Sequence, residues 1–396
     1  MGVLQEVWKR FSSRVDVDLD AIVWNYRLIA QRVAPSEVIP VIKANALGFG
    51  GPIIGLTLQA EGTKTLAVSN FSEALELRSQ GITTGILVMN GLVSEEMSVA
   101  VDKDISFFVF DEDSLIAADR VGRSCGKPAR VHVKIDTGMG RLGIMPEHAG
   151  EFRKLLQKCR TIEVEGVASH LASPYLEEHD EFSRRQFRLF VEAAYAIDPG
   201  HKAKWHIAAS SGVIRFPEMY LDAVRPGALL HGLSRIWPLP WPLKRAGSFR
   251  AKIAQVKELP PGHNVGYRLH WTTPRKTKLG VVPIGTVDGL SGEHADNGYV
   301  LIGGRRCRIV GICSCQMMID LTEVRDVSPG TEVTVFGHQG EDEITVVECA
   351  TFGGTSYANI TARISRRIPR VYWKGGSCVA IDINGDIEFD PVLWRA

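Results

Sequence analysis

The feature that most constrains the fold is an alternation of short apolar runs and helical patterns between residues 16 and 232. About eight parallel-type strands with intervening helices are typical of a (β/α)8 TIM-type barrel. A doubly wound open sheet is the competing interpretation of the same pattern. The strands are expected at residues 38–43, 65–70, 86–90, 106–111, 130–136, 164–170, 204–210 and 223–231.

The first helix is expected over residues 20–33. Asp20 is a natural N-cap, and Ile22, Tyr26 and Ile29 recur on one helical face. Pro35 follows and is expected to end the helix.

The pattern changes after the proline-rich stretch WPLPWP, residues 237–242. Helical periodicity fades, and alternating runs such as TEVTVFG and EITVVE are divided by Gly, Asp and Asn. This predicts a mainly antiparallel β domain from about residue 247 onward. The predicted α/β protein has a barrel domain of residues 14–240 and a β-rich domain of residues 1–13 and 241–396.

The charge balance and the cysteines narrow the class of function that the sequence predicts. Lys plus Arg is 46 and Asp plus Glu is 45, a balance that favours a small-molecule enzyme with no nucleic-acid partner. Seven scattered cysteines indicate a reducing, cytoplasmic setting. Cys313 and Cys315 are too close for a usual zinc pair, so no metal is expected. No apolar run approaches the ~18 residues that span a bilayer, so no membrane partner is expected.

Polar residues stand at successive predicted strand ends, where barrels place their catalytic side chains. A strand-end lysine beside glycine-rich backbone, as at Lys43, is typical of a Schiff-base cofactor site. Gly227 and Ser210 offer donors to a phosphate. Each residue alone fits a solvated lysine, an ion pair or a core histidine, so the hypothesis rests on their joint placement. The strand-end residues are Lys43, Lys134, Asp136, Arg141, His170, His206, Ser210, Ser211 and Arg225.

One motif points elsewhere. Residues 138–143 read GMGRLG and match the dinucleotide fingerprint G-x-G-x-x-G. Pro146 delays the next helix beyond the point where a pyrophosphate would meet its N-terminus. We therefore expect this segment to be a loop outside any dinucleotide site.

At these residues the sequence resembles the alanine racemase family, the fold-type III enzymes that use pyridoxal 5′-phosphate (PLP). The resemblance covers nearly the whole chain. In the first domain it rests on VIKANALGFG, KIDTGMGRLG, HIAASSG and VRPGALLHG. In the second it rests on VPIGTVDG, VGICSCQMMID and GGTSYANITARISRRIPRVY.

The resemblance implies roles for individual residues. Lys43 would hold PLP as a Schiff base and act as the base on the D-face of the substrate. Arg225 would face the pyridine nitrogen. Arg141 would hold the phenolic oxygen of PLP and the substrate carboxylate, with a carbamylated Lys134 orienting it. The other implied cofactor contacts are His170 for the ring and Ser210, Gly227, Ala228 and Tyr357 for the phosphate. The family is a homodimer with shared active sites.

The sequence departs from the family at the second catalytic face. Thr286 in GTVDG stands at the position of the family's tyrosine base, and a threonine hydroxyl is too weak an acid to replace it near neutral pH. In the CSCQ segment, Ser314 and Cys315 stand where the family has methionine and aspartate, so Ser314 would face the substrate carboxylate.

Three hypotheses follow. The leading one is an amino-acid racemase, with alanine as the nearest substrate, in which Cys315 or Cys313 serves the L-face; a thiol has a reference pKa of ~8.5. Against it stands the interpretation that both cysteines are small buried residues. The second hypothesis is a one-base PLP enzyme that catalyses retro-aldol cleavage, decarboxylation or elimination, for example in specialised metabolism. The third is a non-catalytic PLP-binding homologue.

Overall fold

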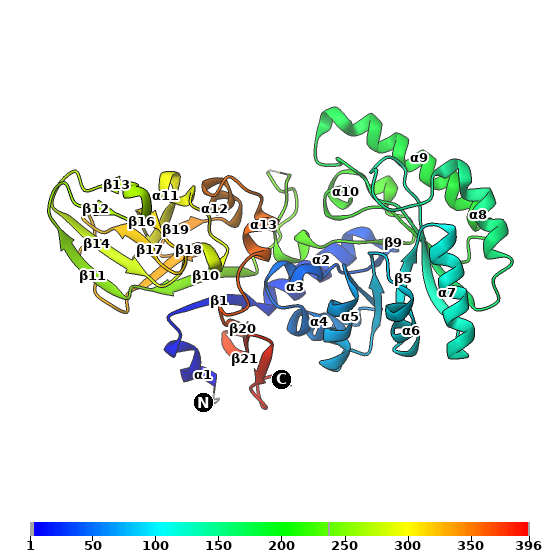
Figure 1. Ribbon diagram of the computed structural model, residues 1–396, viewed down its shortest axis with the longest axis horizontal. Coiled ribbons are helices and arrows are strands. Elements are labelled where there is room, and N and C mark those ends of the chain that lie inside the picture. The colour runs from blue at the N-terminus through cyan, green and yellow to red at the C-terminus, as the bar shows by residue number, and fades with distance from the viewer. Residues whose placement is uncertain (1–3, 237, 395–396) are drawn as a thin grey trace. The chain divides into compact units, whose positions relative to one another are not determined.

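The computed structural model describes residues 4–236 and 238–394, and it divides the chain into two compact units (Figure 1). The barrel unit comprises Ile22–Ala46 and Gly51–Lys244. The β unit comprises the chain up to Ala21, Leu47–Gly50 and the chain from Arg245 onward. Within the described residues, no helix is both long and apolar enough to cross a membrane.

Eight parallel strands close the barrel. The central six, β3 to β8, follow one another in chain order in one parallel sheet. The ring closes because β9 pairs with β2, and single bridges at Ala209–Arg225 and Val41–Ala67 join these two strands to β8 and β3. This confirms the predicted (β/α)8 fold. The strands are β2 (Glu37–Val38), β3 (Thr65–Val68), β4 (Gly85–Val88), β5 (Ile105–Val109), β6 (Ala129–Lys134), β7 (Ile162–Ala168), β8 (Lys204–His206) and β9 (Ala223–Val224).

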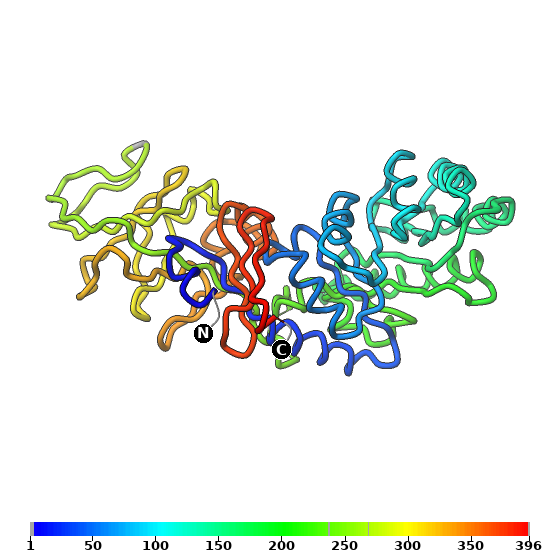
Figure 2. Tube along the Cα trace, turned by 90° about the horizontal axis from the view of Figure 1, so that it is seen from below, coloured from blue at the N-terminus to red at the C-terminus, as the bar shows by residue number. Residues whose placement is uncertain are grey.

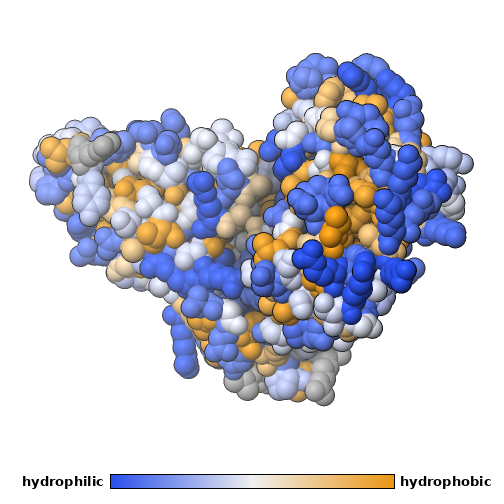
Figure 3. Space-filling view, turned by 45° about the vertical axis from the view of Figure 1, so that its right-hand side comes forward, coloured by the Kyte–Doolittle hydropathy of each residue, from blue (hydrophilic) through white to orange (hydrophobic). Residues whose placement is uncertain are grey.

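Amphipathic helices connect the strands and lie around them (Figure 1). In α7 and α9 the apolar face is buried and the outer face is charged, and Figure 3 shows hydrophilic side chains along the outer edge of this unit. Inside the ring, Ile39, Leu87, Phe108 and neighbouring apolar residues fill the barrel. The helices are α4 (Gly51–Ala60), α5 (Phe71–Ser79), α6 (Ser94–Asp102), α7 (Glu112–Cys125), α8 (Ala149–Leu156), α9 (Asp180–Ile197) and α10 (Ser210–Arg215), with α2 (Leu19–Val33) leading into the barrel.

The β unit is built on a twelve-stranded sheet in which β1 and β20 are the parallel neighbours and the other pairs are antiparallel. The sheet order is β11-β14-β17-β16-β15-β18-β10-β1-β20-β21-β22, with β19 on β18. The strands are β1 (Ser13–Asp18), β10 (Gly247–Lys252), β11 (Gln255–Leu259), β14 (Thr277–Val282), β15 (Tyr299–Ile302), β16 (Arg305–Ile312), β17 (Met317–Asp320), β18 (Glu332–Gln339), β19 (Asp342–Ile344), β20 (Arg370–Lys374), β21 (Ser377–Ile383) and β22 (Asp386–Phe389).

Shorter elements complete the β unit. A small hairpin pairs β12 (Asn264–Val265) with β13 (Trp271–Thr272). The helices are α1 (Leu4–Val7), α11 (His294–Asn297), α12 (Val346–Phe352) and α13 (Tyr357–Ala362). Leu4 packs with Val371 and Ile381, so the N-terminal helix lies beside the C-terminal strands, as Figure 2 shows.

The expected cap of the first helix is wrong by two residues. Helix α2 begins at Leu19, and the side chain of Asp18 accepts a hydrogen bond from Ala21 N at 2.9 Å, which makes Asp18 the N-cap. Asp20 instead accepts from Gly375 N at 2.7 Å. Strand β1 runs up to Asp18, so the helix starts one residue after the strand ends.

Candidate functional site

Five polar side chains gather where the strands of the barrel end. Lys43 and His170 are each influenced by the charge of Arg141, and Arg225 interacts electrostatically with Lys134 and Arg141. The structure therefore brings together five of the strand-end residues that sequence reasoning singled out.

Lys43 stands at the head of a left-handed turn. Ala44, Asn45 and Ala46 all have φ near +50°, a conformation that non-glycine residues rarely adopt. Glu73 holds the turn by accepting hydrogen bonds from Ala44 N and Asn45 N. The Lys43 side chain is exposed in this chain. Partial desolvation of its amine and the positive charge of Arg141 nevertheless lower its pKa. A lowered pKa makes the neutral, nucleophilic amine more accessible.

Asp136 shapes the loop that carries Arg141. Its Oδ1 accepts from Gly138 N, Met139 N and Gly140 N at 2.8–3.1 Å, and its Oδ2 accepts from Arg141 N at 2.8 Å. The GMGRLG segment is therefore a loop, as the sequence predicted, and the structure adds that it folds around the Asp136 carboxylate.

Lys134 ends strand β6 and is 5% exposed. Burial and the charge of Arg225 lower its pKa to about 7. Its Nζ donates to Ile135 O at 2.8 Å. A buried amine with this pKa is partly neutral near pH 7, and only a neutral amine can act as a nucleophile.

Arg225 is fixed inside the barrel by several acceptors. Its Nη1 donates to Nδ1 and O of His206, the latter at 2.9 Å, and its Nη2 donates to Ser169 O at 2.6 Å. Nη2 also lies 3.5 Å from Nδ1 of His170. Burial holds the pKa of Arg225 down at about 10, so it stays charged at neutral pH. Burial also holds the pKa of His170 well below its usual value, so that ring is neutral.

Ser210 and Gly227 form a small backbone cradle. Ser210 Oγ accepts from Gly227 N at 3.0 Å, and Ala228 begins the next turn. A Cβ on residue 227 would stand 3.3 Å from Val41 O, so a glycine keeps this approach open.

The other predicted residues belong to the β unit. Thr286 N donates to Cys313 O at 3.1 Å, and Val287 N donates to Ser314 O at 3.0 Å, which brings the GTVDG and CSCQ segments together. A Cβ on Gly285 would stand 2.2 Å from Cys313 O, so only glycine allows this approach. Tyr357 begins α13 in the same unit.

The two cysteines lie in different surroundings. Cys313 is half-buried and packs against an apolar cluster that includes Val265. Cys315 is exposed, and it interacts electrostatically with the Arg367 guanidinium. Arg367 in turn donates to both carboxylate oxygens of Asp288 at 2.7 and 2.8 Å. The interpretation of both residues as small buried cysteines does not hold for Cys315 in this chain.

Sequence reasoning missed three residues around the site: Glu73, which holds the turn after Lys43, His132, which contacts His206, and Glu165, which lies 3.8 Å from His132. Glu73 was detectable as the last residue of an N-x-x-E capping box after a strand. His132 was detectable from its position two residues before Lys134 in the same strand, which places both on one face. Glu165 carries no signal of its own in the sequence.

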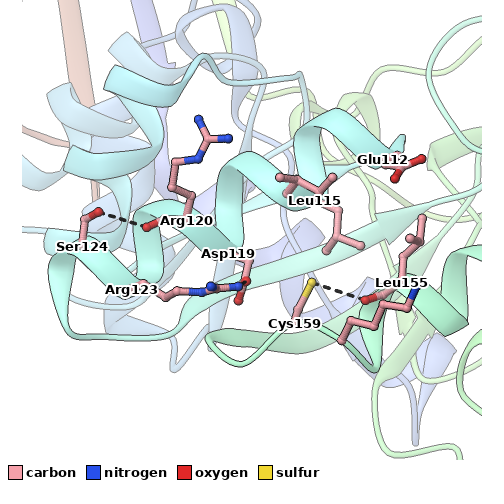
Figure 4. Close-up of a pocket in the computed structure, with 10 residues that line it drawn as sticks. Glu112, Leu115, Asp119, Arg120, Arg123, Ser124, Leu155 and Cys159 are labelled. Carbon is pink, nitrogen blue, oxygen red and sulfur yellow. Dashed lines mark hydrogen bonds and ion pairs between the residues drawn. The ribbon is translucent and has the colours of Figure 1, made fainter.

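A separate surface pocket of about 490 Å³ lies between α7 and the end of α8 (Figure 4). Asp119 lines it and accepts from Arg160 N and Thr161 N at 2.9 Å, while Arg123 pairs with its other oxygen. The predicted site residues are not among its lining residues. Asp119 serves here to tie α7 to the loop before β7.

Cations exceed carboxylates among the strand-end groups. Lys43, Lys134, Arg141 and Arg225 are basic, and the Asp136 carboxylate is already held by loop N–H groups. Such a site suits a small ligand with more than one negative charge, such as a phosphate ester together with a carboxylate.

Comparisons with known proteins identify the family of this chain. Residues 17–235 match the model "Alanine racemase, N-terminal domain" and residues 246–372 match "Alanine racemase, C-terminal domain". The chain is 37% identical over 372 residues to "Alanine racemase 2" of Caldanaerobacter subterraneus subsp. tengcongensis, covering 91% of this chain and 94% of that protein.

Solved structures give the same result. An alanine racemase from Clostridium difficile 630 matches with a TM-score of 0.89 at 30% identity, over 95% of this chain and 99% of that one. The alanine racemase from Bartonella henselae, solved with covalently bound pyridoxal phosphate, matches with a TM-score of 0.83 at 26% identity, over 91% and 99%. This chain therefore belongs to the alanine racemase family, a family of PLP-dependent isomerases.

Proposed function

We propose that the protein is a PLP-dependent amino-acid racemase that inverts Cα of a small amino acid, with alanine as the nearest substrate. The observation that carries this proposal is the strand-end cluster around Lys43, on a chain that matches the family through both domains.

The residues present fit PLP. The excess of positive charge suits its phosphate together with a substrate carboxylate. The cradle of Ser210 and Gly227 offers room for close backbone approach. When bound, PLP would withdraw electrons from Cα of the amino acid and so acidify its α-proton.

The barrel residues would hold the cofactor and substrate. Ser210, Gly227 and Ala228, with Tyr357, would bind the phosphate, and His170 would contact the ring. Arg225, buried and charged, would donate to the pyridine nitrogen and keep a proton off it, because the guanidinium has no acceptor to offer. Arg141 would bind the substrate carboxylate, with Ser314 as a further contact.

Lys43 would exchange the proton at Cα on the D-face, since its lowered pKa allows the amine to act as a base. We assign the L-face to Cys315. Thr286 cannot serve as a base, and Cys313 packs on an apolar cluster, whereas the Cys315 thiol is exposed beside a guanidinium. A thiol with a cationic neighbour is the arrangement found in reactive cysteines.

Proton exchange in D2O tests this assignment. Wild-type enzyme with L-alanine or D-alanine should wash out the α-proton of both and interconvert them. Cys315→Ala should abolish exchange from L-alanine and keep exchange from D-alanine, with Cys159→Ala as a control. If the wild type exchanges the α-proton of D-alanine alone, the one-base hypothesis is established. If it binds PLP but exchanges neither proton, the non-catalytic hypothesis is established. Unchanged exchange on both faces in Cys315→Ala would remove the cysteine from the mechanism.

We also propose a cytoplasmic homodimer in which the β unit of one chain completes the site of the other. The exposure of Thr286, Ser314 and Cys315 in the single chain supports this. Mixing inactive Lys43→Ala and Cys315→Ala chains should restore about a quarter of wild-type activity, because half of the dimers are mixed and each has one intact site. No recovery after verified subunit exchange would contradict shared sites.

A further inference from the structure

A row of polar side chains crosses the inside of the barrel from strand to strand. Nη1 of Arg225, which follows β9, contacts Nδ1 of His206 on β8. Nε2 of His206 lies 2.8 Å from Nδ1 of His132 on β6. Nε2 of His132 lies 3.8 Å from the carboxylate of Glu165 on β7. The histidines are 0% and 3% exposed, whereas the Glu165 side chain is 30% exposed.

The guanidinium fixes which nitrogen donates and which accepts at each step of the row. A guanidinium only donates, so Nδ1 of His206 must accept and its proton must stand on Nε2. That N–H then donates to Nδ1 of His132, whose own proton must stand on Nε2, facing Glu165. Both rings are neutral, since burial lowers the pKa of His132 to about 3 and that of His206 well below its usual value.

A glycine on the neighbouring strand leaves space for the His132 ring. Gly166 is the cross-strand partner of His132, and a Cβ there would stand 2.2 Å from Nδ1 of that ring. Ser106 Oγ donates to Glu165, and Arg130 Nη1 lies 3.6 Å from its other oxygen. Lys204 is the further cation that acts on His132.

Burying these two histidines costs free energy, which indicates that the row has a function. Apolar side chains fill other positions inside the ring. Two buried imidazoles there are unfavourable unless each finds its hydrogen-bond partner. A purely structural core would be served as well by apolar residues of similar size.

We propose that His132 and His206 are positioning residues that orient Arg225 through a hydrogen-bond chain with fixed histidine tautomers, and that the Glu165 carboxylate, 3.8 Å from Nε2 of His132, holds the far end of this chain electrostatically. The catalytic consequence rests on the proposed function, in which Arg225 faces the pyridine nitrogen of PLP. The chain itself does not rest on it.

Nitrogen NMR of the histidine rings tests the chain directly. The full-length protein is labelled with 15N-histidine and measured with and without PLP at neutral pH. Single His→Gln variants at residues 132 and 206 assign the resonances. We expect both rings to be neutral with the proton on Nε2, even without the cofactor. An imidazolium, or a proton on Nδ1 of either ring, would overturn the proposal.

Removal of the Glu165 carboxylate tests its role at the far end of the row. In Glu165→Gln the ring resonances of both histidines should shift, and the visible spectrum of bound PLP should shift with them. Glu163→Gln removes an exposed carboxylate from the same strand and should change neither. Circular dichroism verifies that both variants fold. Unchanged histidine resonances in folded Glu165→Gln would refute the role of Glu165.

Kinetics then separates this proposal from the proposed function. We expect Glu165→Gln, which removes the charge at the end of the chain, to lower kcat by about tenfold and to change KM for alanine by less than about threefold. If the wild-type protein shows the predicted tautomers but racemises no amino acid, the chain stands and the proposed function falls. If it racemises alanine and Glu165→Gln leaves both kcat and the spectrum unchanged, the positioning role falls alone.

Discussion

Substitution of Asp136 tests how the barrel presents Arg141. This carboxylate is 7% exposed and accepts four backbone N–H groups of the loop that leads to Arg141. Asp136→Ala leaves all four donors without their partner. Charged acceptors contribute about 1.5–3 kcal/mol per hydrogen bond, and water can replace some of them in a half-exposed loop. We expect a net loss of about 2–4 kcal/mol in the free energy of unfolding.

The effect should depend on pH in a defined direction. Burial alone would raise the pKa of Asp136, but the four N–H groups outweigh it and hold the pKa below its usual value. The stabilisation is therefore fully present above the unfolded-state pKa of about 3.9 and is lost as pH falls through the lower folded-state value. The difference between wild type and Asp136→Ala should be constant near neutral pH and shrink below about pH 4.

Urea unfolding between pH 3 and pH 8 measures the stability, and steady-state kinetics measures the loop. In the proposed function, a displaced Arg141 should raise KM for alanine by more than about tenfold, whereas Glu147→Ala, an exposed carboxylate farther along this segment, should change neither quantity. A loss below about 0.5 kcal/mol with unchanged KM would refute the idea that Asp136 shapes the site.

Three further substitutions or labels have defined outcomes. Asp119→Ala should destabilise the protein to urea by about 2 kcal/mol, because two backbone donors and Arg123 lose a carboxylate whose pKa is held at about 2 against the effect of burial; a loss no larger than that of Glu112→Ala would contradict this. Arg370→Met should cost about 3–5 kcal/mol in urea unfolding, since four backbone carbonyls lose a buried donor, and an unchanged midpoint would oppose it. Lys134, whose pKa is about 7, should add CO2 with release of a proton; a 13C-carbamate signal that disappears in Lys134→Gln would confirm it, and its absence in the wild type would exclude it.

The sequence was sufficient to predict the barrel because its signal is repetitive. Each buried strand of a parallel barrel reads as a short apolar run, and its polar end marks the mouth of the barrel. Lys43, Lys134 and Arg225 were predicted by that position, and the structure places them in one electrostatic cluster.

Other features were hidden because they depend on contacts between distant segments. The left-handed turn after Lys43 is held by Glu73, and a run of Ala, Asn and Ala carries no sign of positive φ. The start of α2 was misplaced because Asp18 and Asp20 are equally good caps, and only the end of strand β1 decides between them. Glu165 could not be singled out from the sequence, because only the structure shows its carboxylate 3.8 Å from Nε2 of His132.

The most direct test of the central claim is the approach to equilibrium from both enantiomers. Purified holoenzyme is incubated separately with L-alanine and D-alanine, and both enantiomers are followed by chiral chromatography. Because the two substrates are mirror images, a racemase must bring both reactions to equal amounts of each. We predict this outcome for the wild type and its loss in Cys315→Ala. Persistence of the starting enantiomer in both wild-type reactions, despite bound PLP, would contradict the account.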